Sequence, residues 1–233
     1  MVHQIKENIF AIGKTIIKTD KQFSFIAYLI IGKVNVLIDT LPLQLAKMLR
    51  QEIKKLLGND KLDVLILNHS EEDHSGALSE IRKEYPEMIV YCTEECQERL
   101  SKQLDGSVCH LVESGFEVTL GENAFRFSKT PGLHWNDNMV TFLEKEKILF
   151  SNDLFGQLAA CEPPVDSEYE EAYFMQALSN YYARVFSESS KEQKRNAIDI
   201  LKLPVRMIAP GHGILIEKML SPTLKYYQGK LSK

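Results

Sequence analysis

Short hydrophobic segments of strand length alternate along this chain with longer amphipathic segments. Apolar runs at 9–12, 23–31 and 34–38 are separated by turn residues such as Gly32 and Lys33, a pattern that predicts antiparallel strands. The segment 42–57 then places its leucine, isoleucine and methionine side chains on one helical face and stops at Gly58. The chain is therefore expected to begin with antiparallel strands followed by a helix.

The remainder of the chain continues this mixture. The apolar run at 62–67 is typical of a buried strand, and the residues from Ser75 to about Glu84 predict a helix. Further on, we predict strands at 88–91 and 111–112, a helix at 94–104 and more strands between 116 and 150. We then predict one long helical region over roughly 168–203, a strand at 205–209 and a helix at 215–230. This order predicts an α/β fold, an internally duplicated sandwich that forms a single domain over residues 1–233.

Composition and charge exclude several classes of function. Hydrophobic residues make up 44% of the chain and charged residues 26%, as is ordinary for a globular protein. The formal net charge of -4 gives no electrostatic argument for binding nucleic acid or an anionic membrane. The longest apolar stretches, such as 25–31, are far short of a membrane span, and the amino terminus lacks the apolar core of a secretion signal. We expect a cytoplasmic protein with no nucleic-acid or membrane partner.

The cysteines agree with a reducing compartment. Cys92, Cys96, Cys109 and Cys161 show no CxxC spacing, and their number does not indicate a disulfide scaffold. Cys92 and Cys96 could form a weak thiol pair, but the pattern favours the end of a strand and the start of a helix there.

The strongest chemical signal is the loop 68–76, directly after the buried strand at 62–67. Four potential metal ligands lie within six residues of this loop: His69, Glu71, Asp73 and His74. Open α/β sheets place their chemistry on loops at the carboxyl ends of strands. The alternative, an acidic and solvated turn, is disfavoured because histidines flank the acids.

Three more residues of ligand type occupy the same kind of position. His134, Asp153 and His212 follow strands or lie in glycine-rich breaks of the sequence. Loops at one rim of a scaffold converge on one site, whereas core histidines would lie inside the apolar runs. We therefore predict that these three residues join the loop 68–76, while His3 and His110 lack such a context.

On these residues the sequence resembles the metallo-β-lactamase fold superfamily and, within it, the diiron domain of the flavodiiron proteins. The pattern His69-x-Glu71-x-Asp73-His74 is the HxExDH form of that branch, whereas the zinc hydrolases of the superfamily carry HxHxDH. The segments 133–135, 150–157 and 208–213 are also similar to that family, and the match covers essentially the whole chain. The resemblance implies an αββα sandwich.

The resemblance also implies a set of ligands for two iron ions. In it, one iron takes His69, Glu71 and His134, the other takes Asp73, His74 and His212, and Asp153 bridges them beside an oxo, hydroxo or peroxo bridge. Glu71 supports this choice of metal, because a hard oxygen donor favours iron or manganese more than an all-imidazole pocket does, although the set does not exclude zinc.

The chain departs from the family pattern in three places. Flavodiiron proteins carry a flavodoxin domain with FMN after the diiron domain, and we expect neither that domain nor FMN within this chain. Leu158 and the loop 19–24 stand where the family usually has a further histidine. We therefore expect a centre that lacks both a ready source of electrons and proton donors beside its ligands. In these respects the chain resembles a stand-alone, oxygen-binding diiron relative.

Three functions follow, in this order of preference. The first is a non-haem diiron protein that binds dioxygen as a carrier or as a sensor that signals to a partner. The second is a reductase of dioxygen or NO that takes electrons from a separate rubredoxin-like or flavodoxin-like protein. The third is a zinc-dependent hydrolase, against which Glu71 argues. A degenerate fold without metal is disfavoured by the recurrence of ligand-type residues, and the resemblance leaves a homodimer open.

Overall fold

The computed structural model describes residues 1–18, 21–162 and 164–232, which form two β-sheets. The first sheet has seven strands in chain order. They are β1 (Val2–Lys6), β2 (Ile9–Lys18), β3 (Lys21–Ile30), β4 (Val36–Ile38), β5 (Val64–Ile66), β6 (Ile89–Cys92) and β7 (Cys109–Leu111). Pairing is antiparallel from β1 to β4 and parallel from β4 to β7. The predicted antiparallel beginning is confirmed, with β1 as an additional strand.

The second sheet has five strands in the order β12-β11-β10-β9-β8. They are β8 (Glu117–Leu120), β9 (Asn123–Lys129), β10 (Met139–Leu143), β11 (Ile148–Asn152) and β12 (Met207–Pro210). β12 pairs in parallel with β11, and the other pairs are antiparallel. The parallel pair brings the ends of two strands that are far apart in sequence to the same edge.

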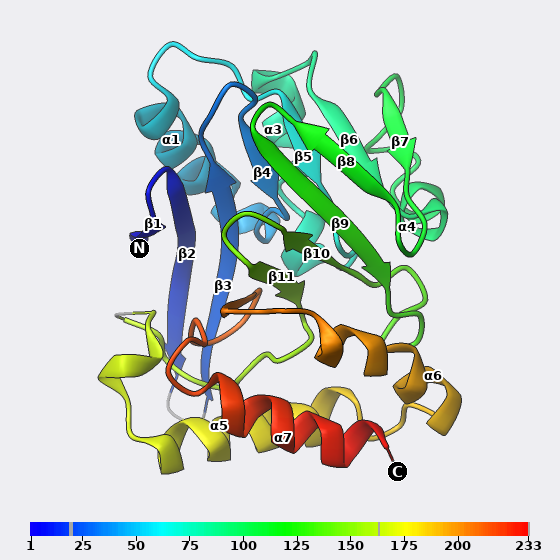
Figure 1. Cartoon of the computed structure of the whole chain (residues 1–233). Coiled ribbons are helices and arrows are strands. Elements are labelled where there is room, and N and C mark those ends of the chain that lie inside the picture. The colour runs from blue at the N-terminus through cyan, green and yellow to red at the C-terminus, as the bar shows by residue number, and fades with distance from the viewer. Residues whose placement is uncertain (19–20, 163, 233) are drawn as a thin grey trace.

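The alternation of side chains along β3 explains how the layers stack. Ile26, Tyr28 and Ile30 lie in the buried cluster that also contains the second sheet, whereas Ala27 and Leu29 belong to a cluster formed with helices on the other face. These outer helices are α1 (Ala46–Leu57), α3 (Leu78–Glu84) and α4 (Glu94–Arg99). On the opposite side of the molecule lie α5 (Glu171–Val185), α6 (Lys191–Asn196) and α7 (Leu220–Leu231) (Figure 1). The predicted αββα sandwich is confirmed.

Helix α1 illustrates how the sequence determines an element. Its buried residues Ala46, Leu49, Ile53 and Leu57 recur at helical spacing, and the helix ends at Gly58, whose φ of 63° is unfavourable for residues with a Cβ. A short 3-10 helix, η1 (Leu43–Leu45), precedes it. The predicted helix is thus confirmed except for its first turn. Within the described ranges, no helix is long and apolar enough to cross a membrane.

The predicted ligand loop and three predicted helical regions have wrong boundaries. Residues of the predicted ligand loop form the short helix α2 (Glu72–Ser75), and the helix predicted at 94–104 ends at Arg99. The region 168–203 is divided among η2 (Asp166–Glu168), α5, α6 and η3 (Ile198–Lys202), because Ser190 and Gln193 form a capping box that starts a new helix. The last helix begins only at Leu220, since Asp166 accepts hydrogen bonds from the backbone of Glu217 and Met219.

The cysteine segment has the predicted form. β6 ends at Cys92 and α4 begins at Glu94, with the Thr93 hydroxyl accepting a hydrogen bond from the Cys96 backbone at 3.2 Å. All four cysteines are free thiols in the structure.

Candidate metal centre

The side chains predicted as ligands lie together at one edge of the sandwich, where the carboxyl ends of β5 from the first sheet and of β11 and β12 from the second sheet approach one another. Their ligand atoms form two groups, and within each group all the atoms lie within 4.8 Å of one another. The first group is His69, Glu71, His134 and Asp153, and the second is Asp73, His74 and His212. The structure therefore brings together every residue in the predicted set.

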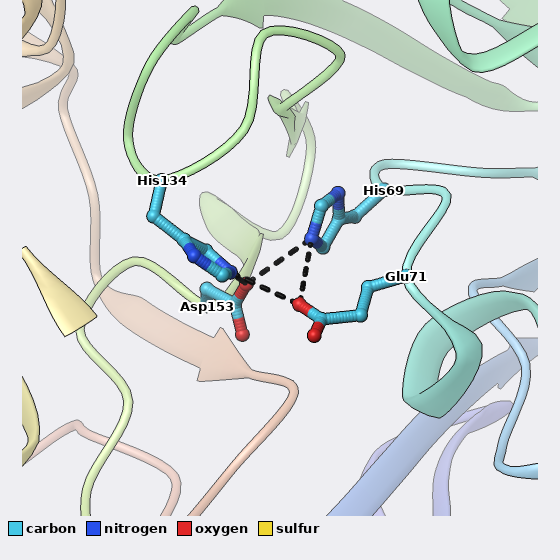
Figure 2. Close-up of side chains that lie close together, drawn as sticks. All are labelled: His69, Glu71, His134 and Asp153. Carbon is cyan, nitrogen blue, oxygen red and sulfur yellow. Dashed lines mark hydrogen bonds and ion pairs between the residues drawn. The ribbon is translucent and has the colours of Figure 1, made fainter. Parts of the chain in front are cut away.

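In the first group, two imidazoles and two carboxylates converge (Figure 2). Oε2 of Glu71 lies 3.3 Å from Nε2 of His69 and 3.0 Å from Nε2 of His134. The second carboxylate, that of Asp153, places Oδ2 at 3.5 Å from the same atom of His69 and at 3.3 Å from that of His134. Two nitrogens and two oxygens thus surround one small volume.

The second group faces the other oxygen of Asp153. Oδ1 of Asp153 lies 3.1 Å from Nε2 of His74 and 3.1 Å from Nε2 of His212. Asp73 adds Oδ2 at 3.4 Å from Nε2 of His212. Asp153 therefore presents one oxygen to each group, which is the geometry of a bridging carboxylate.

The unpaired atoms of the cluster fit a pair of cations. Nε2 of His74 and Nε2 of His212 face each other at 3.2 Å, and each also lies 3.1 Å from Oδ1 of Asp153. Oδ1 of Asp73 and Oδ2 of Asp153 are buried and accept no hydrogen bond from the described residues, even though histidines lie within ion-pair distance. Buried carboxylate oxygens without a donor are costly, and a bound metal ion would satisfy both.

Two of the histidines are oriented by hydrogen bonds on the side away from the centre. His69 donates from Nδ1 to Oδ2 of Asp137 at 3.0 Å, and the backbone N–H of Ser70 donates to the same oxygen at 2.6 Å. His212 donates from Nδ1 to the carbonyl of Ser24 at 2.8 Å. Each hydrogen bond fixes the tautomer that leaves Nε2 free to bind a metal.

The backbone around the second group is also specialised. A Cβ on Gly211 would lie 2.5 Å from Cε1 of His74, so only glycine allows the β12 loop to approach this closely. Asn152 and Phe155, on either side of Asp153, have φ values of 42° and 67°. Such left-handed conformations are unfavourable for residues with a Cβ and are concentrated at functional sites.

The protonation state of each side chain in the cluster depends strongly on its neighbours in the cluster. Hydrogen bonds from His134 and His69 lower the pKa of Glu71 to about 2. Burial disfavours the charged form of His212, but hydrogen bonds to Asp153 and Asp73 outweigh it and raise its pKa to about 10. The carboxylates are thus ionised at neutral pH and can act as ligands without first losing a proton.

A cavity of about 900 Å³ opens on the centre. Its wall includes the apolar side chains of Ile16, Phe23 and Leu158 together with polar groups of α5. Glu71 and His134 are the ligand candidates with the most exposed side chains, at 36% and 27%. Leu158, where the family usually has a histidine, thus lies on the cavity wall. Of the loop 19–24, Gln22 and Phe23 also line the cavity, whereas Thr19 and Asp20 lie outside the described residues.

Sequence reasoning missed two residues that contact the ligands. The hydroxyl of Tyr181 is buried and donates to Oδ1 of Asp153 at 2.8 Å, so the expectation of a centre without a neighbouring proton donor was wrong. Tyr181 lies in the middle of amphipathic α5, where no local signal separates it from core residues. Asp137 follows His134 by three positions in a polar segment, and that proximity was a signal that could have identified it.

Comparison with known proteins agrees with this geometry. Residues 23–213 match a family model described as ODP family beta lactamase. An anaerobic nitric oxide reductase flavorubredoxin of Klebsiella pneumoniae is 30% identical over 251 residues, covering 98% of this chain and 52% of the relative. A coenzyme F420H(2) oxidase of Methanocaldococcus jannaschii is 37% identical over 210 residues, covering 84% and 50%. This chain spans about half the length of these relatives.

The fold is shared with a solved flavodiiron protein. The crystal structure of the flavodiiron protein from Giardia intestinalis superposes with a TM-score of 0.91 at 23% sequence identity, covering 98% of this chain and 58% of that chain.

Proposed function

This chain belongs to the ODP family of metallo-β-lactamase-like proteins, and on that premise we propose that it is a diiron oxidoreductase unit that reduces dioxygen or nitric oxide with electrons from an external donor. The names of its relatives, a nitric oxide reductase and an oxidase, support this activity. The sequence alone favoured an oxygen carrier or sensor. The comparisons favour the reductase, which was the second hypothesis.

The observation that carries the proposal is the position of Asp153 between two groups of ligands. With one oxygen toward each group, its carboxylate can bridge two metal ions. Four histidines and three carboxylates form the whole set, so its charge of -3 offsets most of the +4 of two divalent ions. The mixture of imidazole and carboxylate suits iron.

The residues of the chain have separable roles in this reaction. Bound iron would supply electrons and a binding position for the gas. Glu71 and His134 reach the cavity, so substrate approaches the centre past these two side chains. Phe23 and Leu158 give part of that approach an apolar wall, along which a small gas molecule can pass. Tyr181 lines the cavity and its hydroxyl donates to Oδ1 of Asp153 at 2.8 Å, so we assign it as the proton donor nearest to the centre.

The test is gas consumption by metal-loaded protein. The chain is loaded anaerobically with Fe(II), supplied with a chemically reduced rubredoxin, and followed with oxygen and nitric oxide electrodes. We expect consumption that continues as long as donor remains. Asp153→Asn should consume little gas with the same donor, which controls for reactions of the rubredoxin itself. Uptake that stops after one gas molecule per pair of irons would contradict the reductase.

One observation favours the carrier or sensor as a second candidate. Leu158 provides no proton on the cavity wall, so proton supply rests on Tyr181 and solvent. A protein with slow proton delivery would hold dioxygen rather than reduce it. The same electrode experiment distinguishes the two functions, because a carrier takes up gas once and a reductase takes it up continuously.

A further inference from the structure

The cavity that opens on the metal centre is much larger than a gas molecule needs. Its volume is about 900 Å³. A diatomic gas needs roughly the 30 Å³ that one water molecule takes up in the liquid. Cavities of about 300 to 1,000 Å³ are typical of sites for organic ligands, which combine apolar walls with a few polar groups. The size of the cavity therefore indicates a ligand in addition to dioxygen or nitric oxide.

Part of the lining is apolar and extends as far as the candidate metal ligands. Ile16 and Leu158 contribute aliphatic side chains to it. Phe23 also lines the cavity, and the centroid of its ring lies 4.4 Å from that of the His212 ring. An apolar body that lies along these side chains would be removed from water and would reach the metal centre.

Two amides of the lining have their oxygens occupied. The hydroxyl of Tyr173 donates to Oε1 of Gln22 at 3.1 Å, which connects α5 to β3 across the cavity. Nε2 of Gln176 donates to Oδ1 of Asn180 at 2.8 Å. The amide nitrogens of Gln22 and Asn180 have no acceptor among the described residues, so what these groups still offer to a ligand is N–H donors.

Arg184 adds a positive charge to these donors. Within the described residues it is the one lysine or arginine that lines the cavity, and its exposed side chain forms no ion pair or hydrogen bond there. Arg184 follows Asn180 by four positions in α5 and Tyr181 by three, so the three side chains lie on adjoining turns of one helical face. A guanidinium binds a carboxylate through two parallel hydrogen bonds. Arg184 and Asn180 therefore form a pair of donors that suits a carboxylate.

The distribution of charge determines how such a ligand would lie. The candidate metal ligands Glu71, Asp73 and Asp153 bring three carboxylates to the same cavity, and these repel an anionic head group. Arg184 attracts it and stands apart from the ligand set. The head group would therefore lie at Arg184, with the apolar body directed toward the metal centre.

We infer that the cavity binds an organic monocarboxylate with an extended apolar body, whose head group is held by Arg184 and Asn180 and whose body packs along Phe23 and Leu158. A ligand in this position covers the approach to the metal centre and slows the entry of gas. The effect on gas entry rests on the proposed function, whereas binding of the carboxylate does not depend on turnover.

Calorimetry tests the class of ligand. Anaerobic protein loaded with Fe(II) is titrated with octanoate and with three compounds that each differ from it in one feature. Octanol lacks the charge, octylamine reverses it, and acetate lacks the apolar body. We expect octanoate to bind more tightly than each of the others by about 10-fold or more. Equal binding of acetate would mean that the carboxylate only coordinates iron, and this result or equal binding of octylamine would overturn the inference.

Variants of two arginines test the position of the head group. Arg184→Gln should weaken octanoate binding by about 10- to 100-fold, as loss of a charge-assisted hydrogen bond does. Arg184→Lys should weaken it less, because it keeps the charge but loses the planar fork. Arg195→Gln is the matched control, since Arg195 is an exposed arginine of α6 that lies outside the cavity lining. Its affinity for octanoate should equal that of the parent protein. An unchanged affinity in Arg184→Gln would overturn the inference.

Gas electrodes distinguish this inference from the proposed function. With reduced rubredoxin as donor, octanoate should slow gas consumption by the parent protein and have a smaller effect on Arg184→Gln. Full-rate consumption by protein saturated with octanoate would contradict the effect on gas entry. Gas consumption without octanoate binding refutes the carboxylate site and leaves the proposed function intact. Octanoate binding by protein that consumes no gas refutes the reductase and leaves the site intact.

Discussion

Oδ2 of Asp137 lies 3.0 Å from Nδ1 of His69, on the side of the imidazole that faces away from the metal centre. The carboxylate is buried and also held by the backbone of Ser70, so it fixes the ring in one orientation. We predict that Asp137→Asn lowers metal affinity by about 10- to 100-fold, as loss of such an outer partner does in other metal sites. Competition with a chromophoric chelator measures it.

The control for Asp137 is Asp199→Asn. Asp199 is exposed on η3, pairs only with Lys202 among the described residues, and carries the same charge. Its loss should leave metal affinity unchanged. Equal affinities in the two variants would mean that Asp137 does not orient His69.

Asp153 should be the least replaceable ligand. Because one of its oxygens faces each group, Asp153→Asn removes negative charge from between both metal positions. We expect the variant to retain at most one of two metals by elemental analysis. Retention of both irons with an unchanged absorption spectrum would remove the bridging assignment.

Glu71 should control the choice of metal. Glu71→His restores the imidazole-rich pattern of the zinc hydrolases, so zinc should displace iron when the protein is loaded from an equimolar mixture. Glu71→Gln separates donor type from charge, since it keeps an oxygen but loses the carboxylate. If Glu71→His takes iron as readily as the parent protein, this explanation of Glu71 is wrong.

Metal binding should release protons. Burial disfavours charged His69, yet its hydrogen bonds to Asp137 and Glu71 raise its pKa to about 10. The pKa of His134 rises to about 9, because its attraction to the nearby carboxylates of Asp153 and Glu71 outweighs burial. In the metal-free protein these imidazoles hold protons at pH 7, and a metal must displace them. Apparent affinity should therefore fall as the pH is lowered from 9 to 6, and calorimetry in buffers of different ionisation enthalpy should detect the protons. An affinity independent of pH would contradict the histidine assignments.

Leu158 should limit proton delivery. Leu158→His places an imidazole on the cavity wall, so steady consumption of dioxygen should become faster if proton transfer controls the rate. Leu158→Met retains an apolar side chain of similar size and should leave the rate unchanged. The rates are measured at saturating electron donor. An unchanged rate in Leu158→His would show that another step is limiting.

The ligands were predictable because of where they stand in the chain. A strand-length apolar run before His69 and the glycine-rich break around His212 locate each residue at a strand end, and strand ends share an edge. The stop of α1 at Gly58 was predictable for a similar reason, since a single residue determines it. Such signals are local and can be seen in one short segment.

Contacts between distant segments were not predictable in this way. Tyr181 reaches Asp153 because α5 packs beside the end of β11, and the helical periodicity of α5 reports burial but not the partner. The break before α6 depends on a reciprocal pair of hydrogen bonds between Ser190 and Gln193, which apolar periodicity does not reveal. Asp73 and His74 were placed in a loop because α2 is only one turn long.

Neither group of ligands comes from one sheet alone. His69 and Glu71 follow β5 of the first sheet, while His134 lies between β9 and β10 of the second; Asp73 and His74 likewise face His212, which follows β12. Each bound ion would therefore cross-link the two sheets of the sandwich. Its binding free energy would add to the free energy that holds the two sheets together. Removal of the metal by a chelator would then weaken the packing of one sheet against the other, so that metal supply would affect the stability of the fold as well as its chemistry.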